Sequence, residues 1–500
     1  MVQMEMYMKK TIVISALAVV STISLLSCSS TVSENKKMNV LFIAIDDLRP
    51  ELGVYGIDEV KSPNIDKLAE EGMVFNRAYC QEAICSASRI SLLTGMYCQS
   101  TKIYGIKLKK KDNLPEITSL PKHFKDNGYN TISIGKIYHH VDDDPEAWSK
   151  KPYRAMDGSG YITDESKQLV SLNQQTNPKA GTKGSPTESA DVQDHIHHDG
   201  KLVERAIDEL KNRDKSKPFF LAVGFRKPHL PFTPPKKYWD LYDPMEIDTA
   251  INPYWPKNYT KYTMNNFGEL RNYYGMPRGN EEVGKELARH LKHGYYACVS
   301  FIDAQVGKIL QELDNQGLKD NTIVILWGDH GWKLGEHKSW AKHTNFEIDT
   351  RVPLIISVPD KKMNKHYSNG LVEFVDIYPT LSELCGLSLP AHLEGTSFVP
   401  LLENPERAWK KAAFSIWVAG KYRYDEEIQV IGYAVKTDRY RYIEWKRTKT
   451  GEVEARELYD HDSDPDENIN VIGDPEYASA AKELEGILAA GPEEAKPEEM

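Results

Sequence analysis

The chain has very few cysteines, six in 500 residues. This scarcity excludes a fold held together by disulfides, because such scaffolds are small and dense in cysteine. Two of the six, Cys80 and Cys98, flank Cys85 and could pair with each other. The simpler interpretation is that they are buried thiols that act as small apolar side chains.

Long apolar runs are also lacking. The strongest candidate, Thr11 to Leu26, is shorter than the roughly 20 apolar residues that a membrane-spanning helix needs. It follows two lysines and ends in Leu-Leu-Ser-Cys at Cys28, a pattern that is typical of a secretory signal and resembles a bacterial lipobox. We therefore expect residues 1–28 to be a lipoprotein signal peptide, with Cys28 as the lipid anchor of an exported bacterial protein in the periplasm or on the outer-membrane surface. A plain cleaved signal and a short membrane anchor are the alternatives.

An excess of basic residues is missing too, since the formal net charge is -10. A globally acidic chain is not expected to bind nucleic acid or anionic membrane surfaces. If its substrate is anionic, the basic residues must gather at one pocket. With 40% hydrophobic residues the chain can bury a large core. Its length would fit two to four average domains, although large α/β enzymes can hold one sheet across this many residues.

Continuous apolar runs alternate with helical patterns along most of the chain. The runs are typical of strands buried on both faces of a parallel sheet, and they cover residues 39–45, 131–135, 219–225, 322–327 and 352–358. The helical patterns cover residues 64–71, 119–127, 201–211 and 286–315. This alternation predicts an α/β fold, in which a large, mostly parallel sheet is sandwiched by helices.

The pattern changes after about residue 405. Residues 428–437 and 440–446 indicate antiparallel strands and residues 478–490 a helix, which together predict a small C-terminal α+β subdomain. We therefore expect a catalytic domain over 38–405, this subdomain over 406–490 and a disordered acidic tail over 491–500. Residues 157–200 are polar and indicate a surface insertion, and residues 232–280 indicate irregular structure.

Polar residues directly follow several of the apolar runs: Asp46, Asp47, Lys136, His229, Asp329 and His330. Ligands of open α/β sheets bind outside the carboxyl ends of the strands, so this coincidence predicts a single site. The two acidic pairs supply three carboxylates and one imidazole, which favour Ca²⁺ or Mg²⁺ and do not by themselves demand zinc. The alternative is that these acids cap the helices that follow the strands.

Ordered motifs extend the pattern. The run Cys85-Ser86-Ala87-Ser88-Arg89 is followed by Leu-Thr-Gly ending at Gly95, and further motifs are Asp-Asp-Leu-Arg-Pro at 46–50, Gly-Lys-Ile-Tyr-His at 135–139, Lys-Pro-His at 227–229, Gly-Asp-His-Gly at 328–331, Leu-Gly-Glu-His at 334–337, Trp-Ala-Lys at 340–342 and Glu-Leu-Tyr-Asp at 457–460. With these motifs, from about residue 38 to about 470, the chain resembles the type I, formylglycine-dependent sulfatases of the alkaline phosphatase superfamily. Within that family it is most similar to the iduronate-2-sulfatase branch.

The resemblance implies an alkaline phosphatase-like fold and a sulfuric ester hydrolase. It implies that a formylglycine-generating maturase oxidises Cys85 and that one Ca²⁺ is bound by Asp46, Asp47, modified Cys85, Asp329 and His330. Arg89 and Lys136 would hold the formylglycine diol and the sulfate. His139 would remove the second diol proton, and Asp329 would accept the proton of the attacking hydroxyl. His229 and Lys342 would lie on the leaving-group side, with His229 the better general acid because imidazole titrates near neutral pH.

The substrate implied is a sulfated polysaccharide or oligosaccharide, attacked by an exo-acting enzyme. Plausible pocket-wall residues are Arg226, Trp332, Trp340, Lys342 and His343. Three histidines of the polar insertion, His195, His197 and His198, are better explained by a solvated loop. Ala87 stands where many relatives have proline. The resemblance implies that bacterial radical-type maturases accept alanine at this position, whereas the oxygen-dependent maturase prefers proline. A phosphate or phosphonate ester hydrolase of the same superfamily is the alternative enzyme, and a carbohydrate-binding lipoprotein is the alternative of another class.

Overall fold

The computed structural model describes residues 37–155, 160–264, 268–279, 281–359, 361, 366–419 and 429–498. Residues 38–500 form one compact unit. The expected signal peptide and Cys28 lie outside the described residues. Among the described residues, no helix combines the length and the apolar character needed to cross a bilayer.

A seven-stranded sheet organises the chain. Four parallel strands lie side by side at its centre and one edge: β4 (Asn130–Gly135), β5 (Phe219–Phe225), β1 (Asn39–Ile45) and β6 (Thr322–Gly328). Beyond them come β8 (Leu354–Ser357), which is antiparallel to β6, then β2 (Met73–Phe75) and β9 (Tyr367–Ser368). The predicted α/β fold with a large, mostly parallel sheet is confirmed.

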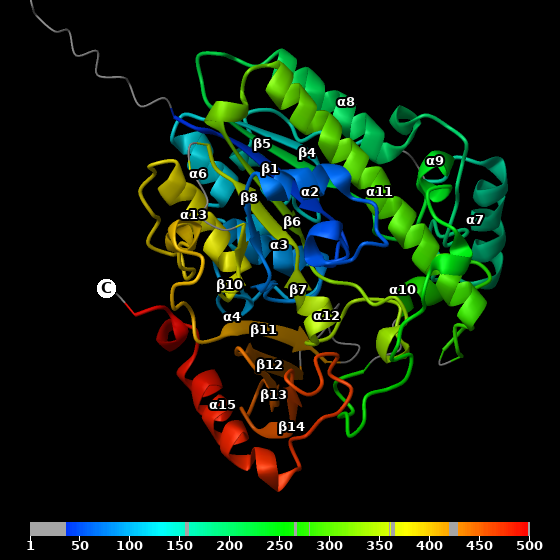
Figure 1. The fold of residues 1–500 in the computed structure, drawn as a ribbon, viewed down its shortest axis with the longest axis vertical. Coiled ribbons are helices and arrows are strands. Elements are labelled where there is room, and N and C mark those ends of the chain that lie inside the picture. The colour runs from blue at the N-terminus through cyan, green and yellow to red at the C-terminus, as the bar shows by residue number, and fades with distance from the viewer. Residues whose placement is uncertain are drawn as a thin grey trace, which may run out of the picture. The chain divides into compact units, whose positions relative to one another are not determined.

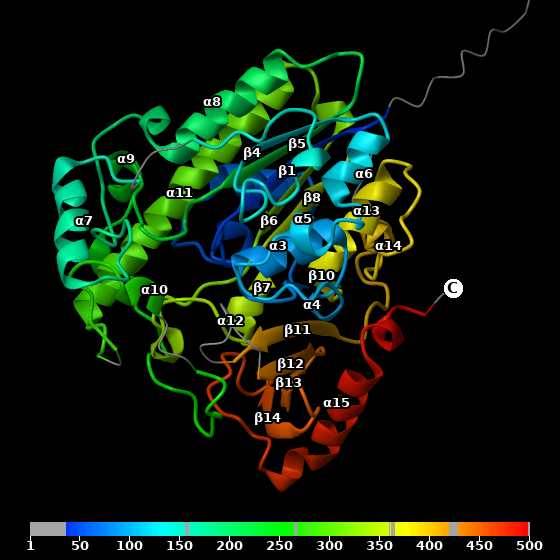
Figure 2. The ribbon, with the colours of Figure 1, turned by 180° about the vertical axis from the view of Figure 1, so that it is seen from behind.

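The apolar strand β1 explains why helices cover both faces of this sheet. Its alternate side chains Leu41, Ile43 and Ile45 pack in one core with the helices α2 (Pro63–Glu70), α8 (His198–Lys211) and α11 (Lys285–Asn315). Val40, Phe42 and Ala44 point the other way, into a second core with α3 (Cys85–Thr94), α6 (Leu120–Asp126) and α13 (Ile377–Leu384). Figure 1 shows α2, α8 and α11 on the near side, and Figure 2 shows α3, α6 and α13 from behind. Apart from Asn39 at its start, β1 has only apolar side chains, and such a strand is stable only between two apolar layers.

Three sequence expectations need correction. Residues 352–358 are not one strand, because Pro353 has no N–H to donate to a ladder. The chain instead gives β7 (Arg351–Val352), which joins β3 (Ala78–Tyr79) and β10 (Val372–Glu373) in a small sheet, and then β8.

The polar insertion is not a plain loop either. It contains α7 (Asp164–Thr176). Its N-cap is Thr163, whose hydroxyl accepts a hydrogen bond from the Ser166 N–H. Asn173 on this helix is buried and donates to the carbonyls of Lys183 and Asn272. Polar contacts hold this helix in place, and hydrophobic periodicity does not detect such contacts.

The C-terminal part carries the antiparallel sheet that the sequence predicts. Its strands are β11 (Ala413–Val418), β12 (Val430–Lys436), β13 (Tyr440–Arg447) and β14 (Val453–Asp460), with α15 (Ala478–Ala490) packed against them. The tail was expected to be disordered, but Glu493–Ala495 forms a 3₁₀ turn in which Ala495 is buried and its carbonyl accepts from the Lys411 N–H. The division at residue 405 stays a prediction. The remaining short helices are α4 (Cys98–Thr101), α5 (Lys110–Asn113), α9 (Lys236–Trp239), α10 (Gly268–Arg271), α12 (Glu347–Thr350) and α14 (Val399–Glu403).

Candidate active site

The carboxyl ends of the four central parallel strands bring the predicted polar residues to one edge of the sheet. Ile45 pairs with Phe225 on one side and with Gly328 on the other. Asp46 and Asp329, which follow two of these residues, are therefore neighbours. The Lys136 N–H donates to the Gly224 carbonyl, which places Lys136 at the same edge.

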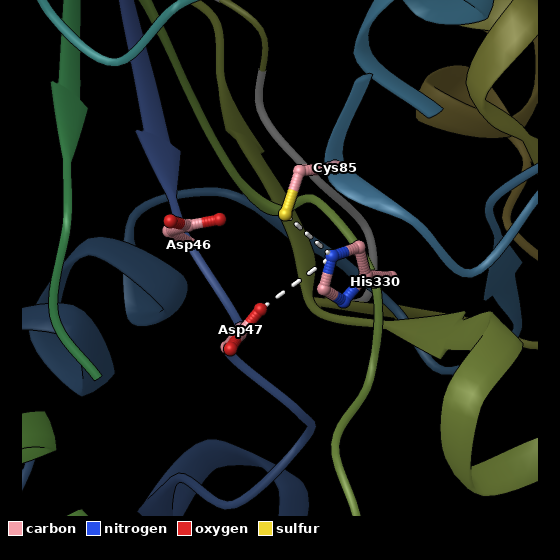
Figure 3. Close-up of side chains that lie close together, drawn as sticks. All are labelled: Asp46, Asp47, Cys85 and His330. Carbon is pink, nitrogen blue, oxygen red and sulfur yellow. Dashed lines mark hydrogen bonds and ion pairs between the residues drawn. The ribbon is translucent and has the colours of Figure 1, made fainter. Parts of the chain in front are cut away.

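Four side chains form a compact buried cluster at this edge: Asp46, Asp47, Cys85 and His330, with one ligand atom from each lying within 4.8 Å of all the others. Figure 3 shows the His330 ring between the Cys85 sulfur and the Asp47 carboxylate. Its Nε2 lies 3.2 Å from Cys85 Sγ and 3.5 Å from Asp47 Oδ1. Its Nδ1 lies 3.0 Å from the Gly331 carbonyl, which assigns the ring proton to Nδ1 and leaves the Nε2 lone pair facing the cluster.

This cluster fits a divalent cation. Asp46 Oδ1 is buried and accepts no hydrogen bond, and a buried acceptor without a donor is costly unless a cation satisfies it. Carboxylate oxygens and a single imidazole are suitable ligands for a hard ion. The pKa values of the two acids are shifted in opposite directions. Burial raises the pKa of Asp47, although the Lys342 charge opposes this shift. Burial would also raise the pKa of Asp46, but the Lys136 charge holds it well below its usual range.

Asp329 borders the cluster. Its Oδ1 accepts from the Asp47 N–H at 3.0 Å and lies 3.6 Å from His330 Nε2, while its Oδ2 accepts from Arg89 Nε at 2.9 Å. Both oxygens are therefore engaged by donors of the chain. Its roles as a metal ligand and as a proton acceptor stay predictions.

Cys85 is the first residue of α3, and all ten residues of this helix are buried. A helix N-terminus ordinarily lowers the pKa of a thiol. Here burial, reinforced by the Asp46 carboxylate, raises the pKa of the Cys85 thiol well above its usual range. The unmodified thiol is therefore protonated and a poor nucleophile, and chemistry at this position needs a different functional group.

Arg89 lies one helical turn after Cys85, so the two side chains share a face of α3. Besides Asp329, its guanidinium contacts the backbone carbonyls of Lys136 and Ile137 and lies 3.6 Å from Asp46 Oδ1. The Arg89 Nη2 group is buried and donates no hydrogen bond, so it can bind an oxyanion.

Lys136 and His139 lie on the turn after β4. Lys136 Nζ forms an ion pair with Asp46 Oδ2. Burial, together with the Lys136 charge, lowers the pKa of His139 to about 2, so its ring is neutral at ordinary pH. The neighbouring His140 faces the Ile106 carbonyl at 2.7 Å, so its contact is with the scaffold.

His229 and Lys342 meet at a carboxylate that the sequence did not reveal. Glu269 on α10 lies 3.1 Å from His229 Nε2 and 3.0 Å from Lys342 Nζ. Burial alone would raise the pKa of Glu269, yet Lys342 and His229 hold it well below its usual range. His229 Nδ1 lies 2.6 Å from the Leu230 carbonyl, so both ring nitrogens face acceptor oxygens. Glu269 belongs to the irregular 232–280 stretch, where no motif marks it.

Asp47, His229 and Glu269 could in principle hold a second metal ion. The Lys342 ammonium already lies between the two carboxylates, 3.0 Å from Asp47 Oδ1 and 3.0 Å from Glu269 Oε2. A positive charge is therefore in place where a second cation would bind. This argues against paired-metal chemistry.

The other candidate residues take supporting or outer positions. Trp332 is fully buried, and its ring lies 4.8 Å from Lys342 Nζ, so it supports that lysine from below and does not form an open wall. His343 stacks on Trp417 of β11 at 5.2 Å, and Trp340 lines a separate hollow with Leu334 and Gly335.

None of the three insertion histidines belongs to a metal-capable group among the described residues. Neither Cys80 nor Cys98 forms a disulfide, so the two do not pair with each other.

Comparison with known proteins settles the family. The sequence profile of the family described as Sulfatase matches residues 38–387, and that described as N-sulphoglucosamine sulphohydrolase, C-terminal, matches residues 335–493. The chain belongs to the sulfatase family. It is therefore a sulfuric ester hydrolase, as the sequence predicted.

The relatives extend along nearly the whole chain. Iduronate 2-sulfatase of Mus musculus is 32% identical and covers 92% of this chain and 96% of its own. A sulfatase of Formosa agariphila is also 32% identical, over 91% and 87% of the two chains. The predicted likeness to the iduronate-2-sulfatase branch is confirmed.

Solved structures show the same fold. One, in complex with its substrate D-glucosamine-2-N,6-O-disulfate, has a TM-score of 0.71 at 23% identity and covers 91% of this chain and 97% of its own. The phosphonate monoester hydrolase of Agrobacterium radiobacter has a TM-score of 0.71 at 24% identity, over 91% and 95%. At these identities the likeness shows the alkaline phosphatase-like fold alone.

Proposed function

We propose that this sulfatase hydrolyses sulfate esters of a sulfated polysaccharide or its oligosaccharides, as an exo-acting enzyme similar to the iduronate 2-sulfatases. The observation that carries this proposal is the buried cluster, in which Cys85 Sγ lies 3.2 Å from His330 Nε2 beside two carboxylates. The relatives support a carbohydrate substrate, because they include iduronate 2-sulfatases and a disulfated glucosamine complex.

The proposal includes a formylglycine made from Cys85 and one divalent ion, Ca²⁺. Asp46, Asp47, His330 and the modified Cys85 would hold the ion, with Asp329 at its border. When bound, the ion would supply positive charge for the sulfate oxygens and for the hydrated aldehyde. Hydration of the aldehyde would turn position 85 into a geminal diol, whose oxygen replaces the unreactive thiol as the nucleophile.

The proposed catalytic roles fall on two opposite sides of the site. Arg89, whose Nη2 donates no hydrogen bond, and Lys136 would bind sulfate oxygens on the side of the sheet edge that carries β4 and α3. Asp329 would take the proton of the attacking hydroxyl, and neutral His139 would take the second diol proton as sulfate leaves. On the opposite side, His229 would protonate the leaving sugar oxygen, with Lys342 beside it to stabilise the developing charge.

Maturation and location complete the proposal. A formylglycine-generating maturase that accepts Ala87 at the third signature position would modify Cys85. The lipoprotein signal and Cys28 would anchor the enzyme to the membrane in the periplasm or on the outer-membrane surface, where sulfated polymers are encountered.

Two measurements on protein from a host with a radical-type maturase test this function. Peptide mass spectrometry should find formylglycine at position 85, and the rate on an aryl sulfate should exceed the rate on the matching aryl phosphate and phosphonate. A faster phosphate or phosphonate reaction would establish the alternative hydrolase. An intact thiol at position 85 would favour a carbohydrate-binding protein instead.

A further inference from the structure

Residues that follow β1 and β6 line a cavity of about 340 Å³, together with residues of the 347–351 and 465–467 segments. Cavities of this size hold small organic molecules, whereas one water molecule takes up about 30 Å³. The cavity is therefore much larger than a bare ion requires. Five of its lining residues are carboxylates: Glu51, Glu336, Glu347, Asp466 and Glu467.

Negative charge is in excess on one side of this cavity. Arg49 bridges two of the carboxylates, through an ion pair with Glu51 and a second one with Glu336 at 2.9 Å. One guanidinium balances one carboxylate, so this bridge leaves one negative charge over. Burial raises the pKa of the exposed rim residue Asp466, and the charges of Asp464 and Glu336 raise it further. A cation that binds beside Asp466 would relieve this repulsion.

A second guanidinium bridge lies on the other side. Arg441 forms ion pairs with Glu347 at 2.5 Å and with Glu467 at 2.6 Å. These two carboxylates and His461 could in principle hold a metal ion, but the positive charge of Arg441 already lies between them. Even when Arg351 is counted, three arginines on or behind the wall face five carboxylates. The cavity therefore attracts a cation, and its wall does not favour a metal.

A buried acceptor without a donor lies on the same wall. Asn252 is only 3% exposed, and its Nδ2 donates to Asn468 Oδ1 at 2.9 Å. The side-chain oxygen of Asn252 finds no donor among the described residues. Leaving a buried acceptor unsatisfied is costly, so this oxygen indicates a ligand group that donates a hydrogen bond.

His337 adds a second unused polar group next to Asn252. Its backbone N–H donates to the Asn252 carbonyl at 2.9 Å, and its side chain is buried at the cavity wall. Neither ring nitrogen has a hydrogen-bond partner in the described part of the chain. Burial, together with the Lys333 charge, lowers the pKa of His337 to about 4. The neutral ring offers one donor and one acceptor, which suit a hydroxyl group.

Arg49 connects this cavity to the candidate active site. Its Nη1 donates to the Trp332 carbonyl at 3.1 Å, and its backbone N–H donates to the Tyr295 hydroxyl at 3.1 Å. That hydroxyl donates in turn to the Asp47 carbonyl at 2.8 Å. None of the four residues of the buried cluster lines the cavity, so the two sites are neighbours and are distinct.

We propose that this cavity binds a small organic ammonium ion that also carries hydroxyl groups, the chemistry of an amino sugar. The ammonium group would donate charge-assisted hydrogen bonds to Asp466 and to the carboxylates that Arg49 bridges. The hydroxyl groups would bind Asn252 Oδ1 and the His337 ring. This inference does not depend on formylglycine or on the metal ion of the active site.

Calorimetry on the full-length enzyme tests the inference with three probes. They are protonated glucosamine, N-acetylglucosamine, which keeps the sugar ring and lacks the charge, and Ca²⁺ alone. Wild type should bind glucosamine, and it should bind N-acetylglucosamine at least about 10-fold more weakly, because the charge-assisted hydrogen bonds are lost. Inorganic sulfate, which would occupy the active site, should leave the affinity for glucosamine unchanged.

Variants of the cavity locate the bound sugar. Asp466→Lys should raise the dissociation constant of glucosamine about 10-fold, and Asp466→Asn should raise it about 3-fold. Both changes are at an exposed position and should leave the fold intact. Asn252→Ala should raise the constant about 3- to 10-fold. The matched control is Asp462→Asn, since Asp462 is an exposed aspartate of the same segment that pairs with Arg439 and should not affect binding.

Four results would overturn the inference. Glucosamine and N-acetylglucosamine could bind equally well, or no cavity variant could change the affinity for glucosamine. Sulfate could displace the sugar, which would place it in the active site. Ca²⁺ could bind in a manner that Asp466→Lys abolishes while glucosamine does not bind, which would make the cavity a metal site.

Discussion

Glu269 offers a sharp test of how the leaving-group side of the site is held. In Glu269→Ala, His229 Nε2 would lose its partner at 3.1 Å and keep only Asp47 Oδ2 at 3.9 Å, which is beyond hydrogen-bond range. Lys342 would keep Asp47 at 3.0 Å. The variant therefore removes the nearest partner of His229, the proposed general acid, and leaves most of the environment of Lys342 unchanged.

The magnitude follows from the one contact that is lost. A hydrogen bond between charged groups contributes about 1.5 to 3 kcal/mol, which corresponds to roughly 10- to 100-fold in rate. We expect that loss in kcat/KM on a sugar sulfate, whose alkoxide must be protonated as it leaves. On nitrophenyl sulfate the loss should be a few-fold, because nitrophenolate is a stable anion. The unfolding free energy should fall by only about 1 to 2 kcal/mol, since Lys342 remains paired.

Two variants control the experiment. Glu269→Gln keeps an acceptor oxygen without the charge, so its losses should be intermediate. Glu282→Ala removes an exposed carboxylate that pairs with Lys338, and it should behave as wild type on both esters. Equal losses of kcat/KM on the sugar and nitrophenyl esters would refute the reasoning. They would mean that Glu269 supports the structure of the whole site and has no specific effect on the proton donor.

Three further outcomes are expected. Burial raises the pKa of Asp303 to about 6, above its unfolded value, so stability that is present at low pH should be lost as the pH rises through 6. Urea unfolding free energies at pH 5 and pH 8 should differ by about 1.5 kcal/mol, and Asp303→Asn should reduce the difference. Lys333→Ala leaves the fully buried Asp349 without its ammonium partner and should cost about 3 to 5 kcal/mol in urea unfolding, whereas a loss under 1 kcal/mol would contradict the pairing. Ca²⁺ should raise the Tm of chelator-treated protein, and Asp46→Asn should abolish the shift; an unchanged shift would place the ion elsewhere.

The sequence predicted much of the fold and of the catalytic centre, for a physical reason. Residues such as Asp46, Lys136 and Asp329 directly follow buried strands, and parallel strands end at one edge, so local pattern was enough to bring them together. Glu269 gave no such signal. It lies on the short helix α10, in a stretch without clear periodicity, and its place in the site depends on a tertiary contact with Lys342. The helix α7 was missed because polar side chains anchor it.

Because α3 is completely buried, Cys85 would have to be modified before the chain folds. Cys85 is 4% exposed and is packed inside a helix with no exposed residue, so a second enzyme cannot reach it once the chain has collapsed. If Cys85 is oxidised to formylglycine as proposed, the rate of this modification competes with the rate of folding. The fraction of active molecules would then be fixed once, at synthesis, and could not be restored later. Slower folding would raise the fraction of active molecules. A molecule that folds before Cys85 is modified would remain inactive for its whole lifetime.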